Sequence, residues 1–152
     1  MLTMNEKDKN EMLEAILNEN EAYQCKLWAV IMAGADTYAL IGGLSTLTGG
    51  AAAALGALSN AYCYLGVTEQ HLNMVIVNSV NVSKIENRLS LPLSSITKAE
   101  AKGGLLPGRK VVMLHFGKEK MKISLMNNAI GSDIQGQKEN VEMFCQIVSK
   151  LG

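Results

Sequence analysis

The amino-acid sequence predicts a mainly β domain, an antiparallel barrel or sandwich of seven short strands that is capped by a C-terminal helix. Three observations support this fold class. Apolar and polar residues alternate with a period of two in several short runs between residues 61 and 125. No run with helical periodicity separates them, so the pattern lacks the crossover helices of a parallel sheet. The last amphipathic stretch, residues 137–151, has helical spacing instead.

Length and composition indicate one domain with an aliphatic core. The chain has 152 residues, of which 48% are hydrophobic, 18% are charged and 5% are aromatic. This is enough apolar material for a single core. Fourteen basic and fourteen acidic residues cancel, which excludes polyanion binding driven by whole-protein charge. Any electrostatic recognition must therefore be local.

The chain begins with a predicted amphipathic helix that is added to the β domain. Residues 5–18 place their apolar side chains on one helical stripe, which consists of Met12, Leu13, Ile16 and Leu17. Because the helix is short, we expect it to dock on the barrel of its own chain or of a neighbouring chain. We divide the sequence accordingly into an N-terminal helix, residues 1–20, and a β domain, residues 21–152.

Seven runs of residues are predicted to form the strands of the β domain. The first three are residues 23–32, 61–67 and 71–77, and the last two of these are joined by a polar turn. The other four are residues 88–93, 96–102, 110–116 and 120–125. Pro92 cannot donate a hydrogen bond to a neighbouring strand, so it belongs at an edge or at a strand end.

The last two strands are expected to form a hairpin with one solvent-exposed face. Residues 117–119 make the connection, and alternate apolar residues on both strands face the same way, namely Val112, Leu114, Phe116, Met121, Ile123 and Leu125. Methionines in the strand pattern are predicted to fill the core of this aromatic-poor protein. These are Met74, Met113 and Met121.

Residues 137–151 close the chain as an amphipathic helix, with Val141, Phe144, Cys145, Val148 and Leu151 on one stripe. Three widely spaced cysteines without a CxxC pair indicate neither a disulfide framework nor a zinc site. The first residues do not form a secretory signal peptide. We therefore expect a cytoplasmic protein, and association with a membrane is the alternative.

The segment between the first two strands is the most unusual part of the sequence. No charged residue occurs between Asp36 and Glu69, and residues 34–59 form an apolar insertion rich in Gly and Ala. Its length approaches that of a membrane span, although paired glycines interrupt it. It is a candidate contact with a second subunit or with a membrane, through Tyr38, Leu40, Ile41, Leu44, Leu47, Leu55 and Leu58.

Basic residues are concentrated in the second half of the predicted sheet. Residues 98–122 hold seven Lys or Arg residues against two Glu residues, whereas residues 1–22 hold two Lys residues against six carboxylates. The basic group is a candidate face for anionic lipid or for an acidic partner, and a solvated sheet face is the alternative. It consists of Lys98, Lys102, Arg109, Lys110, Lys118, Lys120 and Lys122.

The sequence carries no motif of an enzyme or of a cofactor site. His71 and His115 lie in predicted strands without a cluster of metal-ligand spacing, so we expect ordinary sheet positions for them. Cys63 and Cys145 are interpreted as small buried hydrophobic residues. The glycine pairs match no phosphate-binding loop. We expect no catalytic residue, no metal, no cofactor and no nucleic-acid partner.

Three stretches of the chain give a resemblance to a known family. The runs YLGVTEQHLNMV, LPLSSITKAEAKGG and VVMLHFGKEKMKISL, followed by the terminal helix, resemble the bacterial pleckstrin-homology-like (PH-like) domains, which are related in fold to GRAM domains. The resemblance covers residues 21–151. It implies a partly open barrel of two near-orthogonal sheets, with Phe144 in the helix that plugs one end.

The resemblance also implies a role in binding and assembly rather than in catalysis. Eukaryotic relatives that bind phosphoinositides use basic residues around the loop between the first two strands, but this chain has no Lys or Arg between Lys26 and Lys84. We therefore expect a non-catalytic module that self-associates and binds a protein partner. The alternative is a membrane-peripheral module that contacts anionic lipid through the apolar insertion and the basic residues at 98–122.

Overall fold

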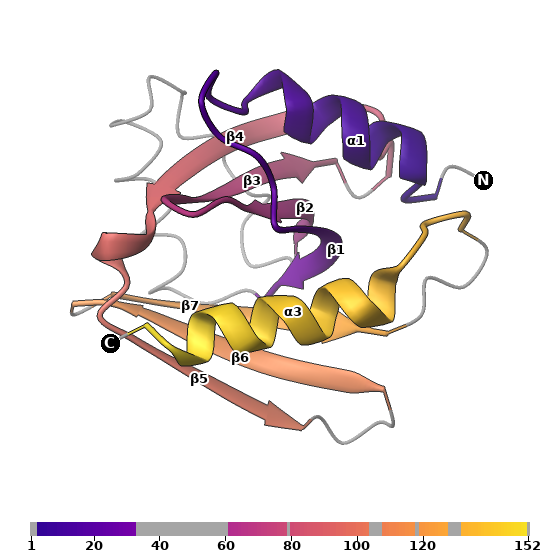
Figure 1. The fold of residues 1–152 in the computed structure, drawn as a ribbon. Coiled ribbons are helices and arrows are strands. Elements are labelled where there is room, and N and C mark those ends of the chain that lie inside the picture. Colours follow the sequence, from indigo (N-terminus) through magenta and orange to yellow (C-terminus); the bar gives the residue numbers. More distant parts are fainter. Residues whose placement is uncertain are drawn as a thin grey trace.

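The computed structural model describes residues 3–32, 61–78, 80–103, 108–117, 119–127 and 132–151. Within these ranges the chain forms seven strands, two α-helices and one short 3-10 helix (Figure 1). Their order is α1 (Glu6–Ala15), β1 (Cys25–Ile31), β2 (Ala61–Val67), β3 (His71–Val77), β4 (Ile85–Pro92), η1 (Leu93–Ser95), β5 (Lys98–Gly103), β6 (Arg109–Phe116), β7 (Glu119–Met126) and α3 (Gln137–Ser149). The predicted mainly β class is confirmed.

The strands form one antiparallel sheet in the order β4-β3-β2-β1-β7-β6-β5. β1 pairs with β2 along its whole length, but it pairs with β7 only at Val30 and Ile31. The sheet divides at this short junction into a β1–β4 half and a β5–β7 half. In Figure 1 β2, β3 and β4 lie above α3, and β5 and β6 lie below it. The two near-orthogonal sheets that were expected are thus joined through β1 into one continuous sheet, and this sheet is not closed.

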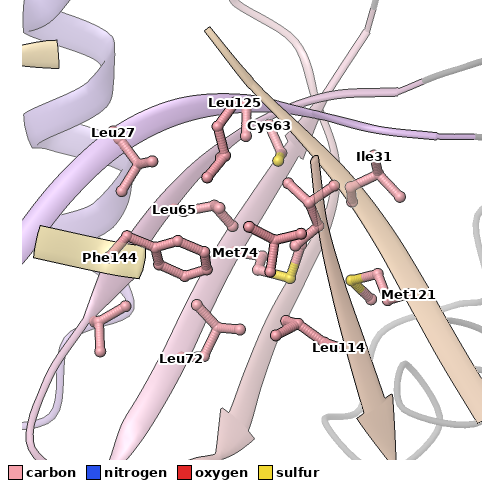
Figure 2. Packing of buried hydrophobic residues seen from close by; sticks show 14 of the residues in the cluster. Leu27, Ile31, Cys63, Leu65, Leu72, Met74, Leu114, Met121, Leu125 and Phe144 are labelled. Atoms are coloured by element: carbon pink, nitrogen blue, oxygen red, sulfur yellow. The ribbon is translucent and has the colours of Figure 1, made fainter. Parts of the chain in front are cut away.

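The inner faces of both halves enclose the main core together with α3. Phe144 is fully buried there, and Val141 and Val148 lie beside it on the same helical face. Figure 2 shows the Phe144 ring pointing among leucine and methionine side chains of the strands. Cys145 and Leu151, which the helical stripe included, are only partly buried at its margin. The core is mostly aliphatic, as the composition indicated.

A second core lies on the outer face of the β1–β4 half, beneath α1. Leu13 of α1 is fully buried against a group of outward-facing residues that includes Trp28, Tyr64, Val75 and Val77. The helix begins at its cap Asn5, whose Oδ1 accepts from the Asp8 N–H at 2.8 Å. Of the predicted stripe, Met12 and Ile16 are partly buried beside this core. α1 thus docks on the sheet of its own chain, and we call this surface the covered face.

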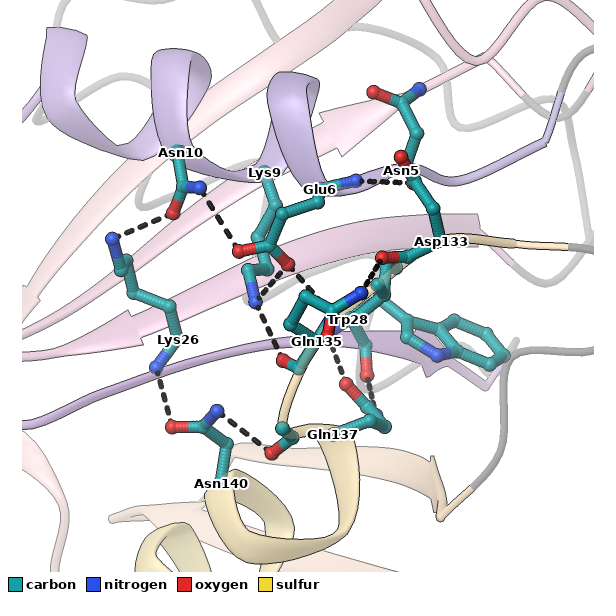
Figure 3. Close-up of polar contacts among 12 residues, drawn as sticks. Asn5, Glu6, Lys9, Asn10, Lys26, Trp28, Asp133, Gln135, Gln137 and Asn140 are labelled. Atoms are coloured by element: carbon teal, nitrogen blue, oxygen red, sulfur yellow. Dashed lines mark hydrogen bonds and ion pairs between the residues drawn. The ribbon is translucent and has the colours of Figure 1, made fainter.

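Polar side chains join α1, β1 and α3 at the point where the sheet divides (Figure 3). Lys9 is almost fully buried and its Nζ lies 2.7 Å from the Glu6 carboxylate and 3.3 Å from the Gln135 carbonyl oxygen. The Lys26 side chain donates to Asn10 Oδ1 at 2.6 Å. These contacts satisfy charges that would be costly to bury unpaired.

Gln137 takes the place of a strand partner at the same junction. Its Oε1 accepts from the Trp28 backbone N–H at 3.2 Å, and its Nε2 donates to the Trp28 and Met126 carbonyl oxygens at 2.9 Å each. Because β7 pairs with β1 only from Val30 onward, these backbone groups have no partner in the sheet on that side. The first turn of α3 therefore bridges β1 and β7 where they separate.

Three expectations about individual residues need correction. Met113 is not core but lies half-buried on the outer side of β6, because it alternates with the buried Val112 and Leu114. Leu93 belongs to η1 rather than to a strand, since β4 ends at Pro92. Tyr23 precedes β1 and lies across Gly66, where a Cβ atom would collide with its ring.

Candidate binding face

The outer face of the β5–β7 half gathers most of the predicted basic residues. The strand register aligns Lys98 with His115 and Lys120, and it aligns Lys102 with Val111 and Ser124. Because side chains alternate between the two faces of a sheet, every second residue of the three strands shares this side. We call this surface the lysine face; it consists of Lys98, Glu100, Lys102, Arg109, Val111, Met113, His115, Lys120, Lys122 and Ser124.

The charged side chains of the lysine face surround a half-buried centre. Four exposed lysines lie on β5 and β7, the strands on either side of β6, namely Lys98, Lys102, Lys120 and Lys122. Val111, Met113 and His115 of β6 lie between them and are of intermediate exposure. The face thus offers four exposed cations around the partly buried side chains of β6.

Glu100 is the only carboxylate among the described residues of the lysine face. It lies 3.1 Å from His115 Nε2 and 3.3 Å from Lys98 Nζ. The hydrogen bond with His115, followed by the contact with Lys98, holds the pKa of Glu100 below its ordinary value. Glu100 therefore compensates Lys98, whereas Lys102, Lys120 and Lys122 form no ion pair with any residue in the described ranges.

Two of the predicted basic residues contribute differently. The Arg109 side chain lies along the sheet, because its Nε donates to Ser124 Oγ at 2.8 Å. Lys110 lies on the opposite side of β6, with the parity of the buried Val112, so its assignment to the basic face is wrong. Lys118 lies outside the described residues.

The candidate contact residues of the apolar insertion also lie outside the described residues. These are Tyr38, Leu40, Ile41, Leu44, Leu47, Leu55 and Leu58. In the part of the chain that the structure does describe, no helix combines the length and the apolar character that a membrane span requires.

A second polar cluster, which the sequence did not reveal, joins the α1–β1 connection to the turn between β2 and β3. Glu21 Oε1 lies 2.7 Å from His71 Nδ1, and the Thr68 hydroxyl donates to the other oxygen of the same carboxylate. Asn18 Nδ2 donates to Glu21 at 2.7 Å. The hydrogen bond from Thr68, followed by that from Asn18, lowers the pKa of Glu21.

The hydrogen bonds of this Glu21 cluster hold the α1–β1 connection against the turn between β2 and β3, and they do not have the geometry of a catalytic group. The Thr68 side chain is buried, and its Oγ1 also accepts from the backbone N–H groups of Gln70 and His71 at 3.1 and 2.9 Å. The hydroxyl proton goes to Glu21 and not to the imidazole, so the histidine does not activate it as a nucleophile. Two hollows flank the cluster, one on each side of the Glu69–Gln70 turn.

The cysteines lack the features of reactive thiols. Burial raises the pKa of Cys25 to about 12 and raises the pKa values of Cys63 and Cys145 as well. Only the thiolate is a good nucleophile, so these shifts oppose reactivity. Cys63 is fully buried, as predicted, whereas Cys145 is partly exposed. The described residues contain no group of three or more His, Cys, Asp or Glu side chains suited to a metal ion.

Comparison with known proteins supports the fold. No family model and no curated protein sequence matches this chain. Among solved structures, it is similar to the hSac2 domain from the human phosphoinositide phosphatase Sac2. The TM-score is 0.52 at 12% sequence identity, and the match covers 91% of this chain and 75% of that chain. At this identity the likeness shows a shared fold and nothing about function.

Proposed function

We propose that this protein is a non-catalytic PH-like binding and assembly module that recognises an acidic protein partner through the lysine face. One observation carries the proposal: one half of the sheet has its outer face covered by α1, whereas the other half exposes lysines on its outer face. Exposed charges contribute little to stability. Their concentration on a single sheet face is therefore better explained by recognition than by folding.

The spacing of the charges suits an extended partner better than a small anion. Adjacent strands lie about 4.8 Å apart and alternate residues of a strand about 6.7 Å apart, so Lys98 and Lys120 are roughly 10 Å apart at their backbones. Small phosphate groups are typically held by converging donors or by a bidentate guanidinium. Arg109, the arginine of this face, is already bonded to Ser124. A broad acidic protein surface can meet the separated lysines one by one.

An anionic membrane surface is the second candidate partner, and the same four lysines favour it. Near an anionic leaflet each Lys contributes about 1 kcal/mol, so four lysines on one face would give reversible and salt-sensitive attachment. In this alternative the apolar insertion at residues 34–59 would add contacts with the bilayer.

The test compares the wild-type protein with a double charge reversal on β7, Lys120→Glu with Lys122→Glu. The probes are a short polyglutamate peptide and phosphatidylcholine vesicles with or without phosphatidylserine, at about 50 mM and about 300 mM salt. The matched control, Lys84→Glu with Lys138→Glu, makes the same change of charge at exposed lysines elsewhere. We expect peptide binding at low salt that the β7 reversal reduces at least about tenfold and the control leaves nearly unchanged.

Each outcome decides between the candidates. Preferential peptide binding that depends on Lys120 and Lys122 supports the acidic protein partner. Binding to phosphatidylserine vesicles without binding to the peptide replaces it with the membrane. Binding that the two double variants weaken equally, or no binding to either probe, contradicts recognition by the lysine face.

A further inference from the structure

The surface around α1 carries unpaired acidic side chains. Glu6 is engaged by Lys9 and by the Gln135 backbone N–H, and Asp8 accepts from Asn5. In contrast, Glu11, Glu14 and Glu19 are exposed and form no ion pair with any described side chain. Lys9 is neutralised within the fold and leaves Lys7 as the exposed cation of the helix. We call Glu11, Glu14 and Glu19 the acidic surface.

The acidic surface and the lysine face cannot neutralise each other within one molecule. α1 packs on β1, β2 and β3, where Leu13 anchors it in the outer core. The lysine face belongs to β5, β6 and β7. In Figure 1 the helix lies at one side of the molecule and β5 at the other, with α3 between them. Charge compensation between these surfaces therefore requires two molecules.

We infer that the acidic partner of the lysine face is the α1 surface of a second copy of this chain. This inference rests on the proposed function and names its partner. Glu11 and Glu14 are three residues apart on a helix, which places their Cβ atoms about 5–6 Å apart. Lys120 and Lys122 are alternate residues of a strand, about 6.7 Å apart. The two pairs match in spacing and are opposite in charge.

The assembly that follows is head to tail. Each copy uses two different surfaces, so the contact is heterologous and every added copy leaves one acidic surface and one lysine face free. Such contacts produce rings if the rotation closes and open chains if it does not. Because the matched residues are exposed ions, the association is electrostatic and weakens as salt screens the charges. The overall charge of zero removes the net repulsion between copies.

The experiment measures self-association by sedimentation velocity of the full chain at about 50 mM and about 500 mM salt, where the Debye length falls from about 14 Å to about 4 Å. Three variants are compared with the wild-type protein. The first is Lys120→Glu with Lys122→Glu, the second is Glu11→Lys with Glu14→Lys, and the third combines all four substitutions. Lys84→Glu with Lys138→Glu is again the control.

We expect the wild-type protein and the control to associate at low salt and to dissociate at high salt. Each double reversal should weaken self-association at least about tenfold, because like charges then face each other. An equimolar mixture of the two double reversals, and the fourfold variant alone, should recover it. This recovery distinguishes a direct contact from loss of folding, since a misfolded variant would not be rescued by its partner.

Two results would overturn the inference: a wild-type protein that stays monomeric at low salt, or association that neither double reversal changes. The proposed function fails separately. If the protein is monomeric but still binds polyglutamate through Lys120 and Lys122, the proposed function stands and only the inferred partner is wrong.

Discussion

The two halves of the sheet have opposite outer faces. In the β1–β4 half, residues such as Tyr64 and Val75 are fully buried beneath α1, so the centre of this half is buried on both sides. In the β5–β7 half, the outer positions are lysines around a half-buried centre, and the inner positions alone are core. The two outer faces therefore differ in burial, and we assign them different roles. The covered face stabilises the fold, and the lysine face is the surface for which we propose recognition.

The largest effect is expected where α1 meets the covered face. Leu13→Ala removes a fully buried side chain and should lower the free energy of unfolding by about 2–5 kcal/mol. Met143→Ala, at a position that is 42% exposed on α3, should change it by less than about 1 kcal/mol. Urea unfolding measures both. Equal effects of the two substitutions would mean that α1 is not docked on its own sheet.

The junction between the halves should be nearly as sensitive. Gln137→Ala leaves the Trp28 N–H and two backbone carbonyl groups without their partner. Each buried unsatisfied group costs about 1–3 kcal/mol, and solvent entry would recover part of this, so we expect a total loss of about 2–4 kcal/mol. Gln146→Ala, at an exposed position of the same helix, is the control. A loss no greater than that of the control would show that α3 does not bridge β1 and β7.

The same substitution on both outer faces compares the halves directly. Val75→Ala on β3 removes fully buried methyl groups and should cost about 2 kcal/mol, because it leaves a cavity under α1. Val111→Ala on β6, where the side chain is only partly buried, should cost less than about 1 kcal/mol. Thermal and urea unfolding of the pair give the difference. The comparison fails if Val111→Ala is the more damaging change.

The smallest effect is a dependence on pH in the β1–β4 half. The folded-state pKa of Glu21 lies below its ordinary value of 4.5. Its contribution to stability is therefore complete above pH 4.5 and is lost as the pH falls through the folded-state pKa. The stability difference between the wild-type protein and Glu21→Gln should be largest at neutral pH and should shrink in acid. A stability difference that stays constant from neutral to acidic pH would contradict stabilisation by the ionised Glu21 carboxylate.

Sequence periodicity was sufficient to predict the strands and helices but not how the sheet is joined. Alternation identified β6 and β7 and the residues of their inner faces, because each strand pattern is local. The same alternation places Lys110 with Val112 rather than with the exposed lysines, and grouping residues by charge alone overlooked this. Strands β2 and β3 are almost continuously apolar, a pattern typical of strands buried on both faces. That pattern was a signal for the covered face.

The missed contacts join residues that lie far apart in the chain. Glu21 and His71 are 50 residues apart, and Trp28 and Gln137 are 109 residues apart. Neither pair has a local spacing that marks it, because the fold alone brings them together. The separation of the acidic surface from the lysine face is likewise invisible until the docking of α1 is known.

The most direct test of recognition by the lysine face is an acylation footprint of the lysines, read by mass spectrometry with and without the polyglutamate peptide. The account predicts that Lys98, Lys102, Lys120 and Lys122 lose reactivity together. Exposed lysines elsewhere, namely Lys7, Lys84, Lys138 and Lys150, should react as before. Protection spread evenly over all exposed lysines, or confined to those outside the lysine face, would contradict the assignment of this face to binding.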